Sequence, residues 1–231
     1  MTLFKKAISN LAHLLFPHVC VNCGSDALND LQLLCFHCLS ELPYTNFALH
    51  ANNPVEKKFW GRLPVKAAAS LFYFNKDSAV QHLLHQLKYQ GKKEVGIYLG
   101  KMLGEKLVNS NRFMHIDAII PLPLATKKEM LRGFNQSTII ANGMAEVMNI
   151  PVCKNIIIRT KATESQIHKT RIERWENMKD VFSLTNADAI AGKNIILVDD
   201  VITTGATAES CGATLLQAKG VSLNIVSVAS V

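Results

Sequence analysis

Short unbroken runs of branched aliphatic residues recur along this chain, and between them apolar residues return every three or four positions. Runs of this length are too short for helices and are typical of strands buried on both faces of a parallel sheet. The intervening period is that of helices with one buried face. The pattern predicts strands at residues 65–74, 116–120, 156–158, 195–198 and 222–231.

Helices are predicted between these strands. The clearest has Val80, Leu83, Leu84 and Leu87 on one face and follows Asp77, which we expect to cap it. Further helices are expected at residues 94–109, 134–148 and 208–219, together with an amphipathic helix over the first sixteen residues. Strands that alternate with helices predict an α/β fold with an open, mainly parallel, twisted sheet.

A change of pattern near residue 65 divides the chain. Residues 43–64 are rich in asparagine, proline and glycine and keep no period, which is typical of a connector. A chain of 231 residues is long enough for one well-filled core and a small module. We therefore expect a small module with its connector at residues 1–65 and a larger domain at residues 66–231.

Two adjacent acids, Asp199 and Asp200, close the most hydrophobic of the predicted strands. Neighbouring carboxylates repel each other, and each loses solvation at the end of a buried strand unless a partner is bound. We expect that partner to be a ligand. The alternative is an ordinary strand-to-helix turn with incidental acids.

A turn rich in threonine and glycine follows the acids, with the sequence Thr203-Thr204-Gly205-Ala206-Thr207. Glycine can take a positive φ, and the start of the next predicted helix would point free N–H groups at an anion. A phosphate group fits such a turn, while the two carboxylates would accept hydrogen bonds from vicinal hydroxyls. The combination predicts a sugar phosphate as the ligand.

Four of the six cysteines, Cys20, Cys23, Cys35 and Cys38, form two C-x2-C pairs separated by eleven residues. Two such pairs supply the four soft ligands of a tetrahedral zinc site. Four thiolates leave no open coordination position, so the zinc would be structural. The alternative is two disulfides, which need an oxidising compartment, and the first residues lack the cleavage site of a secretory signal.

The stretch from Ile195 to Thr207 resembles the signature of the type I phosphoribosyltransferases. A proline-stiffened basic segment runs from Pro121-Leu122-Pro123 to Arg132-Gly133-Phe134-Asn135-Gln136. With the four-cysteine module ahead of them, these motifs resemble the ComF family. Its members are amidophosphoribosyltransferase-like proteins associated in bacteria with DNA uptake and competence.

The resemblance implies a type I phosphoribosyltransferase fold behind a zinc-knuckle module. It also implies 5-phosphoribosyl-1-pyrophosphate as the ligand, with Mg²⁺ bridging its pyrophosphate and ribose hydroxyls. Asp199 and Asp200 would offset positive charge at the reacting carbon, and Arg132 would stabilise the departing pyrophosphate, which makes these three the candidate catalytic residues. The candidate ligand-binding residues are Lys127, Arg132, Asp199, Asp200, Thr203, Thr204, Gly205, Ala206 and Thr207.

The basic segment at residues 121–136 follows a predicted strand. Ligands of open parallel sheets bind beyond the carboxyl ends of the strands, so we expect this segment to face the turn after Asp200. An exposed basic loop is the alternative for Lys127 and Lys128.

Two other polar features remain open. Residues 159–181 form a long polar segment, and in the resembled enzymes a lid of this kind covers the sugar; an ordinary packed helix over residues 171–178 is the alternative. His82 and His85 lie off the apolar face of their predicted helix. We interpret them as a solvated pair rather than a metal site.

Two functions stay open, because the chain ends without residues for the acceptor-binding hood of many related enzymes. One is a pentosyltransferase of unknown acceptor, and the other is a non-catalytic sensor of a phosphoribosyl ligand acting with the DNA-uptake machinery. The net charge of +7 favours an anionic partner. Residues 1–65 carry five basic against four acidic side chains, which disfavours direct DNA binding by the module.

The expected location is the cytoplasm. No apolar run approaches the ~20 residues of a membrane span. The oligomeric state stays open between a monomer and a homodimer.

Overall fold

The computed structural model describes residues 19–26, 28, 32–160 and 181–231. The amphipathic helix predicted for the first sixteen residues and the polar segment at 161–180 lie outside the described residues. The elements are α2 (Phe36–Ser40), α3 (Pro54–Lys57), β1 (Ala67–Tyr73), α4 (Ala79–Tyr89), α5 (Lys93–Val108), the 3-10 helix η1 (Asn111–Phe113), β2 (Ala118–Pro121), α6 (Thr126–Arg132), α7 (Gln136–Met148), β3 (Ile157–Arg159), β4 (Phe182–Leu184), β5 (Asn194–Ile202), α9 (Ala206–Leu215) and β6 (Ser222–Ser230).

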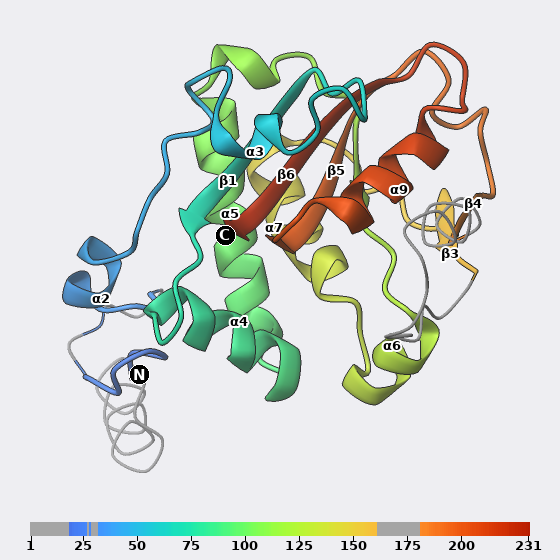
Figure 1. The fold of residues 1–231 in the computed structure, drawn as a ribbon. Helices are drawn as coiled ribbons and strands as arrows, with labels where there is room; N and C mark the ends of the chain where they lie inside the picture. Colours follow the sequence, from blue (N-terminus) through green and yellow to red (C-terminus); the bar gives the residue numbers. More distant parts are fainter. Residues whose placement is uncertain (1–18, 27, 29–31, 161–180) are drawn as a thin grey trace, which may run out of the picture.

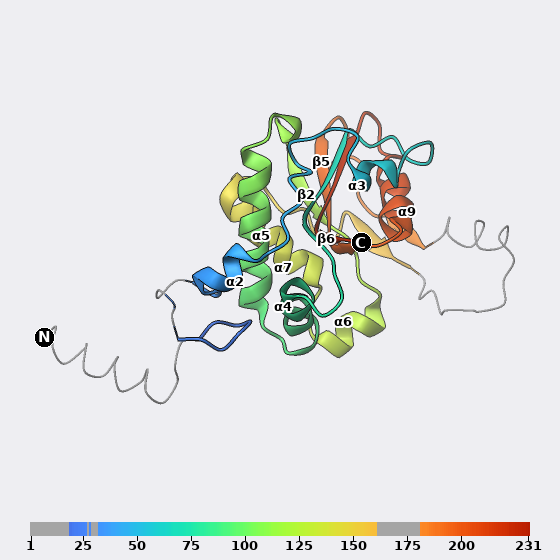
Figure 2. The same ribbon diagram turned by 60° about the vertical axis from the view of Figure 1, so that its left-hand side comes forward.

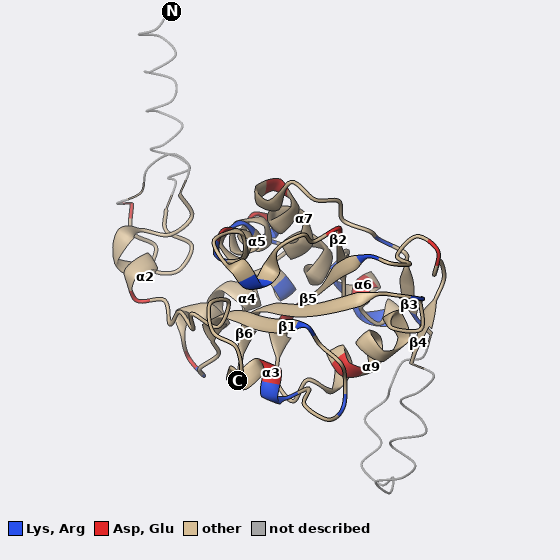
Figure 3. Ribbon diagram, turned by 90° about the horizontal axis from the view of Figure 1, so that it is seen from above, with Lys and Arg blue, Asp and Glu red and all other residues tan. Residues whose placement is uncertain are grey.

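A four-stranded parallel sheet with the order β1-β6-β5-β2 forms the centre of the fold (Figure 1). Helices α5 and α7 cover one face, and α3 and α9 cover the other, so the molecule has three layers (Figure 3). The two inner strands are fully sandwiched, which is why β5 reads as a continuous apolar run. The predicted class, an open and mainly parallel α/β sheet behind a cysteine module, is confirmed.

Strand β5 is longer than its apolar run. It continues through both acids to Ile202 because β6 keeps pairing with it, from Leu197 opposite Ile225 to Ile202 opposite Ser230. The prediction that the acids close the strand was therefore wrong by two residues. A partner strand supplies a hydrogen-bond ladder that hydrophobicity alone does not reveal.

Helices α5 and α7 pack at unusually close range. A Cβ added to Gly100 would lie 2.2 Å from the carbonyl oxygen of Ile140, and one added to Gly143 would lie 2.2 Å from that of Ile97. Only glycine allows the two backbones to approach this far. The pair forms a rigid layer under the sheet, and α7 begins beside the acids of β5.

The connector is an ordered part of the body rather than a loose linker. Its residue Tyr44 bridges Phe72 on the edge strand β1, and Thr45 N–H donates to the carbonyl of Leu71 at 3.1 Å. Pairing of this kind covers an edge that would otherwise expose unpaired backbone groups.

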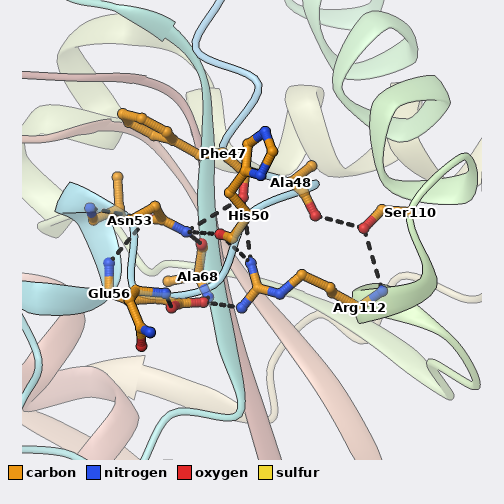
Figure 4. A network of polar contacts seen from close by, with 10 residues as sticks. Phe47, Ala48, His50, Asn53, Glu56, Ala68, Ser110 and Arg112 are labelled. Atoms are coloured by element: carbon orange, nitrogen blue, oxygen red, sulfur yellow. Dashed lines mark hydrogen bonds and ion pairs between the residues drawn. The ribbon is translucent and has the colours of Figure 1, made fainter.

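A polar network holds the connector in place (Figure 4). The Arg112 guanidinium donates to the carbonyl of His50 at 2.7 Å and forms an ion pair with Glu56, whose carboxylate also accepts from Ala68 N–H at 3.1 Å. Asn53 caps α3 and donates to the Ala68 carbonyl at 2.8 Å. The connector is thus fastened to β1 and to the segment after α5.

Three local predictions differ from the structure. Ser78, not Asp77, caps α4, since its hydroxyl accepts from Gln81 N–H while Asp77 takes a positive φ. The basic segment after β2 contains the short helix α6. The run at 156–158 contributes to β3, which pairs antiparallel with β4 outside the main sheet.

Candidate functional site

The two acids lie at the carboxyl half of β5, beside the start of α7. Ser137 Oγ donates to the Asp199 carboxylate at 3.1 Å, and Gln136 Nε2 donates to Asp200 Oδ2 at 3.2 Å. Asn135, just ahead of them, caps α7 and donates to the Leu122 carbonyl at 3.0 Å. The segment that follows β2 therefore returns to the acid pair, as the placement of ligand sites in parallel sheets predicts.

Asp200 has a charged protein partner. Lys88 Nζ, in the last turn of α4, lies 2.8 Å from Asp200 Oδ2, and the Asp200 residue is 7% exposed. We expected a ligand to compensate both acids, whereas the structure compensates Asp200 with an ammonium and an amide. Neither Lys88 nor Gln136 was predicted as a site residue, because their distance from the acids in sequence hides the contact.

Asp199 has no cation as its direct partner among the contacts described, and it behaves differently. Burial, followed by the charge of neighbouring Asp200, raises the pKa of its carboxyl to about 7. The N–H of Asp200 and the hydroxyl of Ser137 act in the opposite direction by donating to it. Asp200 is thus paired with an ammonium, while the Asp199 carboxyl can gain or lose a proton close to pH 7, so the pair can take up a cation or a hydroxyl-rich ligand.

The turn after β5 leads directly into α9. Gly205 has φ 82° and precedes the helix, and as a glycine it offers no side chain to cap α9. Thr204 Oγ1 accepts from the N–H of Ala206, the first residue of α9, at 3.4 Å. A Cβ on Gly205 would lie 3.1 Å from the Phe59 ring, so both conformation and space favour glycine there. Thr203, Thr204 and Thr207 are exposed. A helix start beside hydroxyl side chains can receive a phosphate group.

The basic residues of α6 have separate surroundings. Arg132 is half-buried, with its guanidinium carbon 5.3 Å from the centre of the Tyr89 ring, next to Lys88. Lys127 and Lys128 are exposed, in agreement with the alternative of an exposed basic segment. The structure thus brings Arg132 to the last turn of α4, the turn that also carries Lys88.

Arg159 is a candidate that the sequence interpretation did not name. It ends β3, and its guanidinium carbon lies 5.6 Å from the centre of the Phe182 ring. Burial lowers its pKa, while the charge of Asp199 acts in the opposite direction. A cation at the end of a short apolar run, Ile156 to Ile158, was the only sequence signal for it.

A cavity of about 360 Å³ adjoins these groups. Its walls come from the segment after β2, from α6, from the start of α7 and from the segment that leads into β3. Neither acid lines it. Asn135, which does, comes directly before the residues that donate to the acids, and Arg159, which also does, interacts electrostatically with Asp199. Apolar walls, including Phe134 and Ile157, and the cations Lys154 and Arg159 make it suitable for a small, partly flat, polar molecule.

The four predicted zinc ligands gather into one cluster, with their sulfur atoms all within 4.8 Å of one another. None of the six cysteines forms a disulfide. Burial acts against ionisation of Cys20, yet backbone N–H groups of Cys23, Cys35 and Asn22 lower its pKa to about 6. Burial raises the pKa of Cys38 to about 12.

The backbone donors around Cys20 are typical of a site built for thiolates, so the residues fit a zinc ion. Asn22 Nδ2 also donates to Cys38 Sγ at 3.3 Å. His82 hydrogen-bonds to Asn22 at 3.1 Å between Nδ1 and Oδ1. His82 and His85 are both exposed, as predicted, and His82 in addition contacts the loop that carries two of the cysteines.

Comparison with known proteins places this geometry in context. The chain is 29% identical to competence protein F of Haemophilus influenzae over 178 residues, which are 75% of this chain and 74% of that one. It is 29% identical to the DNA utilization protein YhgH of Escherichia coli O157:H7 over 203 residues, covering 86% and 84% of the two chains. Competence protein ComFC of Bacillus subtilis is 33% identical over 99 residues, or 43% and 38%.

The chain is a homologue of competence protein F. The resemblance to the ComF family is thereby confirmed. No protein-family model matches the chain.

Solved structures that resemble the fold include phosphoribosyltransferases. Glutamine phosphoribosylpyrophosphate amidotransferase from B. subtilis is 22% identical with a TM-score of 0.39, covering 56% of this chain, which spans a quarter of that larger protein. Adenine phosphoribosyltransferase from Leishmania tarentolae is 13% identical with a TM-score of 0.40, covering 79% and 89% of the two chains. Within the described residues, no helix has the length and apolar character to cross a membrane.

Proposed function

We propose that this chain is a phosphoribosyltransferase-like protein that binds 5-phosphoribosyl-1-pyrophosphate with Mg²⁺ and acts in the use of DNA taken up by the cell. The supporting observation is the acid pair, Asp199 and Asp200, which is bound by the start of α7 and is followed by the glycine turn that begins α9. The names of the homologues support the link to DNA uptake. Cytoplasmic location is part of the proposal, because free thiolates persist in a reducing compartment.

Each group has a task in this proposal. Asp199 and Asp200 accept hydrogen bonds from the ribose hydroxyls, and the turn from Thr203 to Thr207 holds the 5′-phosphate by backbone N–H groups and hydroxyls. Carboxylates and substrate phosphates are the usual surroundings of Mg²⁺, which when bound would neutralise charge on the pyrophosphate. Arg132 and Lys127 supply cations toward that group.

The raised pKa of Asp199 fits this task. A carboxyl with a pKa of about 7 loses its proton readily when a positively charged or hydroxyl-bearing ligand binds. If the ribose carbon develops positive charge during displacement of pyrophosphate, the ionised pair stabilises it electrostatically. Neither acid has to act as a general base.

Two versions of the function are distinguished by the acceptor. The cavity of about 360 Å³ is lined by Arg159, which interacts electrostatically with Asp199, and it offers room for an acceptor, which favours a pentosyltransferase. The ion pair between Lys88 and Asp200 favours the second version, a sensor that holds a phosphoribosyl ligand without turnover, since one acid is already neutralised. We keep the transferase as the first proposal because the cavity is formed by residues flanking the site.

The module and the body are proposed to divide the work, with residues 1–65 as a zinc-holding unit and residues 66–231 as the ligand-binding unit. Cys20, Cys23, Cys35 and Cys38 would hold the zinc, whose role is structural.

Calorimetry tests the central proposal. Titration of phosphoribosyl pyrophosphate with Mg²⁺ into the wild-type protein is expected to show saturable binding, and Asp199→Asn and Asp200→Asn are expected to weaken it at least about tenfold, as loss of a charge-assisted hydrogen bond does. Asp188→Asn is the matched control, because Asp188 is an exposed acid elsewhere on the chain. No heat of binding, or equal binding by all variants, would contradict the proposal.

A pyrophosphate-release assay with a panel of bases and amines separates the two versions. Release that depends on an acceptor and on Asp200 identifies a transferase. Binding without release across the panel identifies a sensor.

A further inference from the structure

Helix α4 contacts the cysteine module and the acid pair at once. In Figure 2 it lies between the N-terminal loop and α6. Its apolar side, which includes Leu83, Leu84 and Leu87, is buried in the body. Its polar residues reach in two directions, toward the loop that carries Cys20 and Cys23 and toward Asp200.

On the module side, Gln86 and His82 bind the short loop between the first two cysteines. Gln86 Nε2 donates to the carbonyl of Val21 at 2.5 Å and lies 3.0 Å from His82 Nε2. His82 Nδ1 in turn lies 3.1 Å from Asn22 Oδ1. Because the Asn22 amide donates to Cys38 Sγ, a continuous chain of hydrogen bonds runs from a predicted zinc ligand to α4.

On the acid side, Lys88 is the last basic residue of α4 and pairs with Asp200 at 2.8 Å. Gln86 and Lys88 are two residues apart, which is about 3 Å along a helix axis and roughly 200° around it. The two side chains therefore leave opposite sides of one rigid helix. A shift or rotation of α4 that breaks the Gln86 contact also moves the ammonium of Lys88.

We propose that the cysteine module positions Lys88 through α4, so that zinc binding and ligand binding at the acid pair are coupled. Lys88 is a positioning residue in this scheme, because its ammonium pairs with the Asp200 carboxylate and orients it. His82 and Gln86 fix the helix that carries it. The proposal concerns the ligand site of the proposed function, yet its first test needs no ligand.

The first test observes Asp200 directly. In protein with ¹³C-labelled aspartate, the Asp200 carboxyl carbon is identified as the resonance that Asp200→Asn removes. Zinc-loaded His82→Ala is expected to shift this resonance relative to wild type, because α4 loses its contact with Asn22. His85→Ala is the matched control, since His85 is exposed on the same helix and stacks on Tyr89 instead, 4.8 Å between ring centres.

Lys88→Met completes this test. It is expected to shift the Asp200 carboxyl resonance by itself, and adding His82→Ala to Lys88→Met is expected to change the resonance no further, since contacts that act through one group are not additive. An Asp200 resonance that is identical in wild type and zinc-loaded His82→Ala, with both proteins folded by circular dichroism, would overturn the inference.

The second test measures the coupling. Zinc transfer to a colorimetric chelator is followed with and without phosphoribosyl pyrophosphate and Mg²⁺. Ligand is expected to strengthen zinc retention by at least about fivefold in wild type and His85→Ala, and to have no effect in Lys88→Met, because coupling between two sites is reciprocal. Ligand that binds wild type but leaves zinc retention unchanged would contradict the coupling.

The two tests fail separately. If phosphoribosyl pyrophosphate does not bind wild-type protein, the proposed function is wrong, while the carboxyl resonance still decides whether the module positions Lys88. If the ligand binds but the resonance does not respond to His82→Ala, the proposed function stands and this inference falls.

Discussion

At the scale of single residues, Asp199 and Asp200 show how position separates two identical side chains. Asp200 receives the ammonium of Lys88 and the amide of Gln136, whereas Asp199 receives a hydroxyl and one backbone N–H. Burial and the charge of Asp200 raise the pKa of Asp199 to about 7. Its titration therefore makes the stability of the protein depend on pH.

The direction of this dependence follows from the pKa values in the two states. The ordinary pKa of the carboxyl is 3.8 and the folded one is about 7, so the folded protein holds the proton more tightly. The stabilisation is complete below about pH 4 and is lost as the pH rises through about 7. We expect Asp199→Asn to be close to wild type in stability at pH 4.5 and more stable by roughly 2 kcal/mol at pH 8.

Urea unfolding of the two proteins at pH 4.5 and pH 8 measures this difference. Asp188→Asn, at an exposed position, is the control. A stability difference that stays constant with pH would show that Asp199 titrates normally.

At the scale of elements, the contact between α5 and α7 depends on glycines at the crossing. Gly143 faces the backbone of Ile97, and Gly104 lies farther along, where an added Cβ would meet the Met144 carbonyl at 3.2 Å. The close approach fixes the height of α7 under the sheet. The start of α7 carries the donors for both acids.

Gly143→Ala is expected to destabilise the protein by about 3 kcal/mol, because a Cβ only 2.2 Å from a carbonyl oxygen forces the helices apart. Gly104→Ala is the graded control and is expected to change the unfolding free energy by no more than about 1 kcal/mol, since the helix preference for alanine offsets the tighter contact. Denaturant unfolding compares them, and equal effects of the two substitutions would contradict this packing account.

The connector depends on a half-buried ion pair. Arg112→Ala is expected to cost about 3 kcal/mol in unfolding free energy, since it leaves the buried carboxylate of Glu56 without its cation. It also removes one of the donors to the carbonyls of Phe47 and His50, which keep their hydrogen bonds from Asn53. Lys101→Ala is the control, because its ion pair with Glu146 is about half exposed and contributes little. If both variants lose the same unfolding free energy in thermal or urea unfolding, the ion pair between Arg112 and Glu56 contributes no more than the more exposed one.

At the scale of the whole molecule, the cysteine module and the body share one continuous core. Cys20, Cys35 and Cys38 are buried in the same cluster as the connector and the sheet. Loss of the metal is therefore expected to destabilise the body as well as the module.

Purified, reduced protein is expected to contain about one zinc per chain, and Cys35→Ser is expected to lose it and to melt several degrees lower, because structural zinc binding contributes folding free energy. Cys153→Ser is the matched control, since Cys153 is half-buried and lies outside the cluster. Elemental analysis and thermal melts measure both. Well under one zinc per chain in wild type, or equal zinc loss in the control, would remove the metal site.

Local chemistry explains which features could be predicted. Three features could be predicted because a few neighbouring residues determine them: the cysteine pairs, the strand at Ile195 to Val198 and the turn at Gly205. The parallel α/β class follows from the alternation of short apolar runs with helical periods. The role of Asp199, Asp200, Thr203–Thr207, Lys127 and Arg132 in ligand binding stays a prediction. Helix α6 was missed because a basic segment without a buried residue has no apolar face to reveal it.

The sequence by itself determined the cysteine cluster, the strand that carries the acids and the order of the elements, because short-range spacing and hydrophobic period govern these. Only the tertiary structure decided that Lys88 forms an ion pair with Asp200 and that Gln136 donates a hydrogen bond to it. The same holds for the nearness of Arg159 to Asp199 and for the contacts by which α4 joins the module to the site. The physical reason is range: a side-chain contact across 64 or 112 positions depends on how layers pack, and no local pattern records it.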